Sequence, residues 1–257
     1  MSAFDVYKWL DAGPIALVKG AGHPKTGGCW MSAISRYAGE QWTDHPECVC
    51  PVIRNFCILI NDLLPSDAAR GRVIGPRLFD PIGTRGSLEA MELRAVMLLN
   101  ACVRMCLPIA VKVNHLDYYY DFTRFPESPS FPGCTVDTVI TLHAVWRTLD
   151  QLPYTPMQSD ATYVALCLHK AACYIAGTGN EYASCRVESL YRAAGHVGTA
   201  YETCLGAGGG IKKPENMEDW IVQNVMPVFD QMVAIGSKTP IELSCSERDL
   251  DCAVQRF

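Results

Sequence analysis

Cys29 is the residue whose setting in this sequence most favours chemistry. It follows Gly27 and Gly28, precedes Trp30 and stands where a helix is expected to begin. The positive end of a helix dipole and its free N–H groups stabilise a thiolate, and Gly-Cys-Trp is similar to the nucleophile setting of papain-like enzymes. These residues favour a cysteine-dependent enzyme with Cys29 as the catalytic group. The alternative is that Cys29 packs beneath the glycine-rich loop.

A cysteine nucleophile needs a histidine base within hydrogen-bond reach. The spacing in the sequence does not select one of the three candidate bases. These candidates are His143, His169 and His196.

A second cluster offers ligands for a metal ion. His45, Cys48 and Cys50 carry the imidazole and thiolate groups that zinc binds. Their Cys-x-Cys spacing departs from the Cys-x₂₋₄-Cys pairs of structural zinc sites, so a further ligand such as Cys29 or His23 would have to fold back onto them. Zinc is therefore the one cofactor that the sequence suggests, in a small zinc-binding protein.

Four residues make up the candidate ligand-binding block: Gly28, Trp30, Asp44 and His45. Glycine density in this region indicates that the backbone approaches something closely, either a ligand or another helix. The alternative for Asp44 and His45 is a turn, in which Asp44 caps the following segment and His45 forms local hydrogen bonds.

Helical periodicity dominates the elements that must position these residues. It predicts an all-α fold of about eight to ten helices, packed orthogonally or as a bundle. Pro108 is expected to kink or split the longest of them. The expected helices cover residues 4–10, 29–37, 51–64, 74–79, 87–113, 136–152, 160–176, 180–205, 216–235 and 246–255.

An aromatic segment over residues 117–132 interrupts this pattern and suggests a boundary. It separates two expected helical halves, residues 1–116 and 133–257, unless the chain forms one continuous domain. The segment contains three consecutive tyrosines and three prolines but few basic residues. Protein contact or internal packing is therefore a better interpretation of it than base stacking.

The composition limits the classes of function. Hydrophobic residues make up 49% of the chain and charged residues 19%, which is typical of a globular protein. The net charge of −5 gives no general attraction to nucleic acid or to anionic lipid, and no stretch reads as a membrane span or a secretory signal. The thirteen cysteines are then expected to be reduced core residues of a cytoplasmic protein.

Several short motifs follow one another between residues 27 and 113. They are Gly28-Cys29-Trp30-Met31, Ala38-Gly39-Glu40, Asp44-His45-Pro46-Glu47-Cys48, a Pro51-led helix that ends in Asn61-Asp62, and Gly83-Thr84 before a long helix. This block resembles a group of uncharacterised bacterial and bacteriophage proteins. The resemblance implies a helical fold and a bacteriophage origin, but it brings no reaction, ligand or partner, and it does not extend to the second half.

The leading hypothesis is therefore an intracellular helical interaction protein. It would bind a protein partner or a second copy of itself, and a bacteriophage-encoded chain of this kind would act on a host process. The cysteine-dependent enzyme and the zinc-binding protein remain the alternatives.

Overall fold

The computed structural model describes residues 16–112, 136–151, 156–177, 186–205, 214 and 216–236. In these ranges the regular elements are helices and no strand is formed, which confirms the all-α prediction. None of these helices is both long enough and apolar enough to cross a membrane. The helices expected at 4–10 and 246–255, and the aromatic segment 117–132, lie outside the described residues.

The chain divides into two compact units. Residues 1–86 and 216–257 form the first unit, and residues 87–215 form the second. The divisions therefore fall at 86/87 and 215/216, whereas the expected boundary was the aromatic segment. The first unit is built from two separate stretches of the chain, and the second is an insertion between them.

Helix α3 (Pro51–Leu63) is the central helix of the first unit, and it packs against both α2 (Trp30–Tyr37) and α10 (Met226–Ala234). Pro51 stands at its first turn, where a missing N–H costs nothing. Its buried residues, including Phe56 and Ile60, recur at helical spacing.

Helix α4 (Asp67–Ile74), with the 3₁₀ turn η1 (Gly75–Arg77), is longer than the sequence predicted. The expected helix in this region covered only residues 74–79. The Ser66 side chain accepts a hydrogen bond from the Ala69 N–H at 3.2 Å and so caps the new helix. Ser66 and Asp67 are thus a start signal for a helix in a stretch where none was expected from the sequence.

The returning stretch of the first unit is one helical run with a π-helical turn inside it. Helix α9 (Met217–Trp220) leads into the π turn η4 (Ile221–Val225), which leads into α10. In the π turn, the N–H of Met226 donates to the carbonyl of Ile221, five residues earlier. Pro227 follows at once and has no N–H for an ordinary helical bond, which accounts for a π turn at this place.

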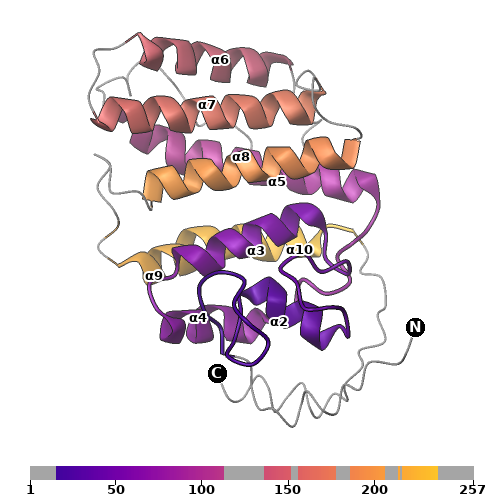
Figure 1. Ribbon diagram of the computed structural model, residues 1–257. Helices are drawn as coiled ribbons and strands as arrows, with labels where there is room; N and C mark the ends of the chain where they lie inside the picture. Colours follow the sequence, from indigo (N-terminus) through magenta and orange to yellow (C-terminus); the bar gives the residue numbers. More distant parts are fainter. Residues whose placement is uncertain are drawn as a thin grey trace. The chain divides into compact units, whose positions relative to one another are not determined.

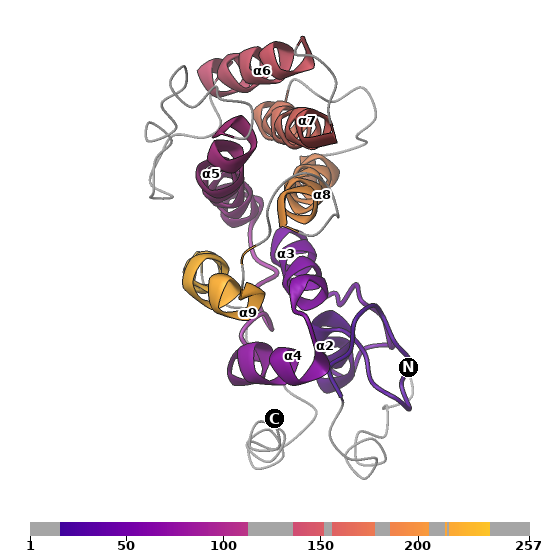
Figure 2. The same cartoon turned by 90° about the vertical axis from the view of Figure 1, so that its left-hand side faces the viewer.

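Four helices form the second unit: α5 (Leu88–Lys112), α6 (Val136–Asp150), α7 (Pro156–Ala176) and α8 (Arg186–Leu205). Helix α7 packs against the other three, α5 also packs against α8, and α6 lies at the edge on α7 (Figures 1 and 2). Ser87 caps α5 by accepting a hydrogen bond from the Ala90 N–H at 3.2 Å. Helix α5 continues through Pro108, so this proline does not split it.

Candidate functional site

Cys29 is the N-cap residue of α2, where a helix start was expected, but its thiol is buried. Only 1% of the residue is exposed. Its Sγ accepts the Ser32 N–H at 3.5 Å and lies 3.4 Å from Ser32 Oγ. The Ser32 hydroxyl itself donates to the Ala21 carbonyl at 3.0 Å, which leaves the Cys29 S–H as the donor to Ser32 Oγ.

Burial raises the pKa of the Cys29 thiol, and hydrogen bonding with Ser32 and with the Met31 backbone offsets this only in part. The helix N-terminus was expected to favour a thiolate, but the loss of water outweighs it here. The three candidate bases all belong to the second unit, while Cys29 belongs to the first. The Cys29 thiol forms hydrogen bonds with both the N–H and the hydroxyl group of Ser32. The catalytic role of Cys29 therefore stays a hypothesis, because the described residues show no histidine bonded to its thiol.

Gly28 and Trp30 are both used for packing. A Cβ on Gly28 would lie 2.5 Å from an atom of the Trp42 ring and 2.9 Å from the Ala21 carbonyl oxygen. Trp30 is fully buried, its Nε1–H donates to the Leu78 carbonyl at 2.9 Å, and its ring centroid lies 4.9 Å from that of Phe229. The close approach inferred from the glycines is therefore made to the protein itself.

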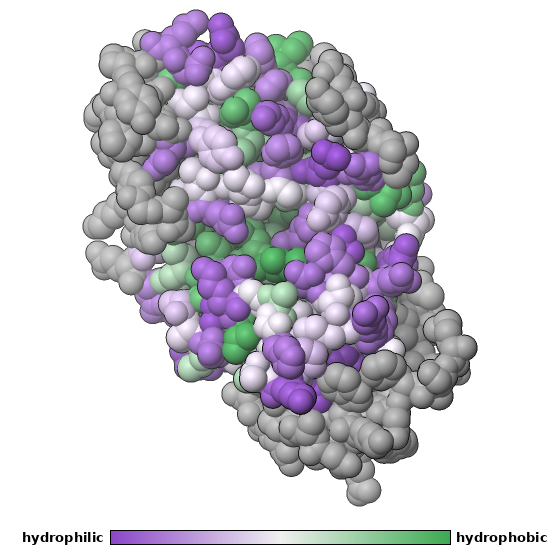
Figure 3. All heavy atoms as spheres, in the orientation of Figure 1, coloured by the Kyte–Doolittle hydropathy of each residue, from purple (hydrophilic) through white to green (hydrophobic). Residues whose placement is uncertain are grey.

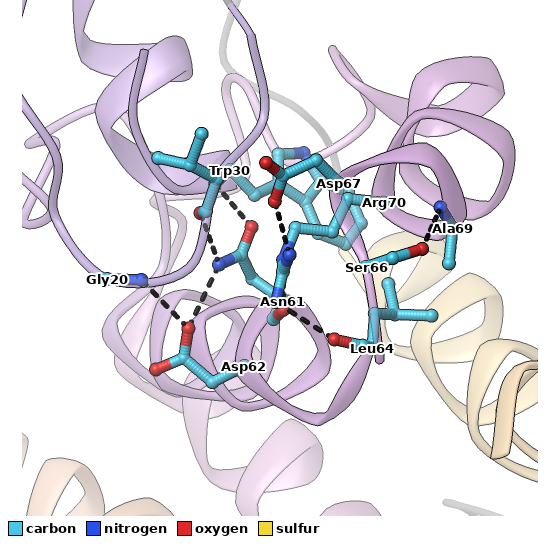
Figure 4. A network of polar contacts seen from close by, with 10 residues as sticks. Gly20, Trp30, Asn61, Asp62, Leu64, Ser66, Asp67, Ala69 and Arg70 are labelled. Carbon is cyan, nitrogen blue, oxygen red and sulfur yellow. Dashed lines mark hydrogen bonds and ion pairs between the residues drawn. The ribbon is translucent and has the colours of Figure 1, made fainter. Parts of the chain in front are cut away.

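Asn61 holds the loop over residues 16–28 to α3. This side chain is fully buried; its Oδ1 accepts the Trp30 N–H at 3.2 Å, and its Nδ2 donates to the Val18 carbonyl at 3.0 Å. Nδ2 also donates to Asp62 Oδ1 at 3.0 Å, which in turn accepts the Gly20 N–H at 3.2 Å. Figure 4 shows Asn61 between Trp30 and Asp62. The pair Asn61-Asp62, noted in the motif block, is thus a structural anchor.

The Arg70 side chain caps the C-terminal end of α3, a role that the sequence did not indicate. The residue is 4% exposed. Its Nε donates to the Asn61 carbonyl and its Nη2 to the Leu64 carbonyl, both at 2.8 Å, and its Nη1 pairs with Asp67 Oδ1 at 2.6 Å (Figure 4). The guanidinium thereby satisfies carbonyl groups that a helix end leaves without partners.

The segment 44–50 does not assemble a metal site. His45 is exposed and its Nδ1 pairs with Asp44 Oδ1, whereas Cys50 is 1% exposed and its N–H donates to Thr84 Oγ1 at 3.1 Å. In the part of the chain that the structure describes, no three His, Cys, Asp or Glu residues are grouped as metal ligands.

The surroundings of Cys48 also disfavour metal binding by its thiol. Its N–H donates to Glu40 Oε1 at 2.9 Å. Burial, together with the charge of Glu40, raises the pKa of the Cys48 thiol to about 12, which disfavours the thiolate that zinc needs. The zinc hypothesis for His45, Cys48 and Cys50 therefore gains no support from the geometry.

A different set of reactive side chains comes together in the second unit. The imidazole cluster consists of His143 and Trp146 on α6, with His169 and Cys173 on α7. His143 Nδ1 lies 3.4 Å from His169 Nε2, and Cys173 Sγ lies 3.8 Å from each ring nitrogen of His169. The Trp146 ring is stacked on that of His169, with the centroids 5.7 Å apart and the planes at 12°.

The surroundings of His169 favour its neutral form. Burial, and then the neighbouring His143, lower the pKa of His169, while a hydrogen bond with the Val139 backbone acts in the opposite direction. Sequence reasoning considered these histidines only as bases for Cys29. The spacing of three between His143 and Trp146, and of four between His169 and Cys173, places each pair on one helix face. The sequence therefore contained the signal for each pair. It did not indicate that α6 and α7 pack against each other.

Comparisons with protein-family models, with curated proteins and with solved structures gave no match to this chain. The resemblance of residues 27–113 to bacterial and bacteriophage proteins thus stays a prediction.

Proposed function

We propose that this chain is a helical binding protein that recognises another protein through the outer face of α6. The observation that carries this proposal is the exposure of Ile140. Its side chain is 59% exposed, the highest value among the exposed large apolar residues in the described ranges. Large apolar groups on a surface helix are typical anchors in protein recognition.

One face of α6 packs inside the second unit, and the opposite face is exposed among the residues that the structure describes. Leu142, Val145 and Leu149 are fully buried, and the helix packs against α7. Figure 3, drawn in the orientation of Figure 1, shows hydrophobic atoms among hydrophilic ones in the region of α6.

The outer face of α6 carries a short recognition stripe. Ile140, Ala144 and Arg147 are all exposed and follow one another at positions i, i+4 and i+7. This is the spacing with which a helix presents anchors to the groove of a partner. An aliphatic anchor followed by arginine also fits protein interfaces, in which arginine is enriched.

The overall charge supports a protein rather than a nucleic acid as the partner. A net charge of −5 would repel a phosphate backbone. A bacteriophage origin, which the motif resemblance implies, would make a host protein a natural partner for this surface.

The proposal is tested by proximity crosslinking with a photoreactive residue beside the stripe, in the cell of origin. We expect one protein to be captured by the wild type and lost in Ile140→Asp. Val222→Asp provides a matched control, because Val222 is an exposed aliphatic residue, 48% accessible, in the first unit. Capture that survives Ile140→Asp, or no capture at all, would refute the proposal.

Self-association is distinguished in the same experiment. Light scattering on the purified protein over a range of concentrations reports whether the captured partner is a second copy. A wild type that dimerises, with an Ile140→Asp variant that does not, would identify the partner as the chain itself.

A further inference from the structure

We propose that His143 and His169 bind a divalent transition-metal ion of the zinc type between α6 and α7. The inference concerns the purified chain alone and does not depend on the protein partner proposed above. Imidazole nitrogen is the ligand that zinc, copper and nickel ions share.

The distance between the two rings suits such an ion. Zinc–nitrogen bonds of 2.0–2.1 Å in tetrahedral geometry separate two ligand nitrogens by about 3.3 Å. His143 Nδ1 and His169 Nε2 are 3.4 Å apart and share a hydrogen bond, which a bound ion would replace. Because the two histidines stand on different helices, helix packing brings the nitrogens together and an ion would need little rearrangement.

Surrounding groups hold the His169 ring in place. Trp146 is stacked on it in a nearly parallel orientation, and the Val139 backbone forms a hydrogen bond with it. His143 also contacts Trp146, with the ring centroids 5.3 Å apart. Groups that fix the orientation of a ligand ring reduce the cost of ordering it when a metal binds.

Among the described residues, no further side chain completes the coordination of such an ion. No three His, Cys, Asp or Glu residues in the described ranges form a complete ligand set, so water would fill the other positions. Cys173 Sγ is equally far, 3.8 Å, from both nitrogens of His169, which places it beside the ring and away from the lone-pair axis of Nε2. An ion held by protein on one side and by water on the other is accessible to an exogenous ligand.

The test is a titration of the full chain with Zn²⁺ under a non-thiol reductant. Calorimetry measures the affinity, and carbon-detected NMR of the imidazole groups shows which rings respond. The signals of His143 and His169 are expected to shift together at substoichiometric zinc. His143→Ala should weaken this binding by about tenfold or more.

His196→Ala is the matched control. His196 is another half-buried histidine of the second unit, stacked on Tyr174 with a pKa lowered first by burial, and its removal should leave the zinc affinity unchanged. His143 is exposed, so its replacement is not expected to unfold the unit, and circular dichroism checks this.

Two results would overturn the site. One is zinc binding of equal affinity in the wild type and in His143→Ala, which would place the ion elsewhere. The other is an absence of any shift in the signals of His143 and His169. Either result is separate from a failure of partner capture, which is measured with the Ile140→Asp variant and not with His143→Ala.

Discussion

The Nε–H of Arg70 donates to the backbone carbonyl of Asn61 at 2.8 Å, while the side chain of Asn61 holds the loop over residues 16–28. Asn61 therefore joins three segments of the first unit through its backbone and side chain at once. Polar groups that are buried in this way are costly to leave without partners.

We expect Asn61→Ala to lower the free energy of unfolding of the first unit by about 2–4 kcal/mol, because the Trp30 N–H and the Val18 carbonyl would lose a buried partner. Urea unfolding followed by tryptophan fluorescence, to which buried Trp30 contributes, measures the change. Asn55→Ala, at a half-buried position of the same helix, should cost clearly less. Equal costs for the two variants would contradict the anchoring role of Asn61.

Arg70→Met should cost about 2–3 kcal/mol, since it keeps the length of the side chain but leaves the carbonyls of Asn61 and Leu64 without a donor. Asp67→Asn is the control for the ion pair. Asp67 has a side chain that is 64% exposed, so this change should cost no more than about 0.5 kcal/mol. The same unfolding assay applies, and a larger effect of Asp67→Asn would mean that the pair, not the cap, stabilises this region.

The loop over residues 16–28 contains two glycines with positive φ whose surroundings differ. Gly27 has φ of +124° and a Cβ there would lie 2.4 Å from the Ala16 carbonyl oxygen, whereas a Cβ on Gly20, with φ of +75°, would meet nothing within 4 Å. Gly27→Ala should therefore destabilise the first unit by about 2 kcal/mol or more, and Gly20→Ala by about 1 kcal/mol. Thermal unfolding of both variants decides the order.

Thiol labelling tests the state of Cys29. Because Cys29 is 1% exposed and burial raises its pKa, we expect iodoacetamide to modify half-buried Cys173 well before Cys29 in the native protein. Mass spectrometry of the digested protein assigns each label to its peptide. Preferential modification of Cys29 would restore the hypothesis of a cysteine-dependent enzyme.

The second unit should lose stability as the pH falls. Burial is the main reason that the pKa values of His169 and His196 lie below their ordinary value of 6.5. The unfolded chain therefore takes up protons first, so this contribution is complete above pH 6.5 and declines as the pH falls below it. Hydrogen exchange of α7 at pH 7.5 and pH 5.5, corrected for the intrinsic rate, should show the loss. The His169→Gln variant should show a smaller loss of stability between pH 7.5 and pH 5.5. An unchanged pH dependence would argue against a contribution from this residue.

Local signals in the sequence predicted most of the helices. Ser87 caps α5, and Asn216, whose side chain accepts the Asp219 N–H, caps α9 near the expected starts. Cys29 likewise stands at the start of α2. These are short-range effects, in which a side chain meets a backbone group three residues away.

The contacts that define the candidate sites were not predictable in this way. Asn61 meets Trp30 across 31 positions and His143 meets His169 across 26. Helical periodicity tells which side of a helix is buried, but not which helix covers it. For the same reason the start of α2 was expected, while the burial that keeps Cys29 protonated was not.

The discontinuous first unit has a consequence for how the chain folds during its synthesis. The ring of Trp30 packs on that of Phe229. In the sequence, the second unit is inserted between these two residues. When residues 16–86 emerge from the ribosome, α10 has not yet been synthesised. Helix α3 therefore lacks one of its packing partners at that stage. The second unit is contiguous and can complete its fold in the meantime. Maturation of the first unit should therefore be the slow, late event, and pausing before residue 216 would prolong the exposure of its apolar core.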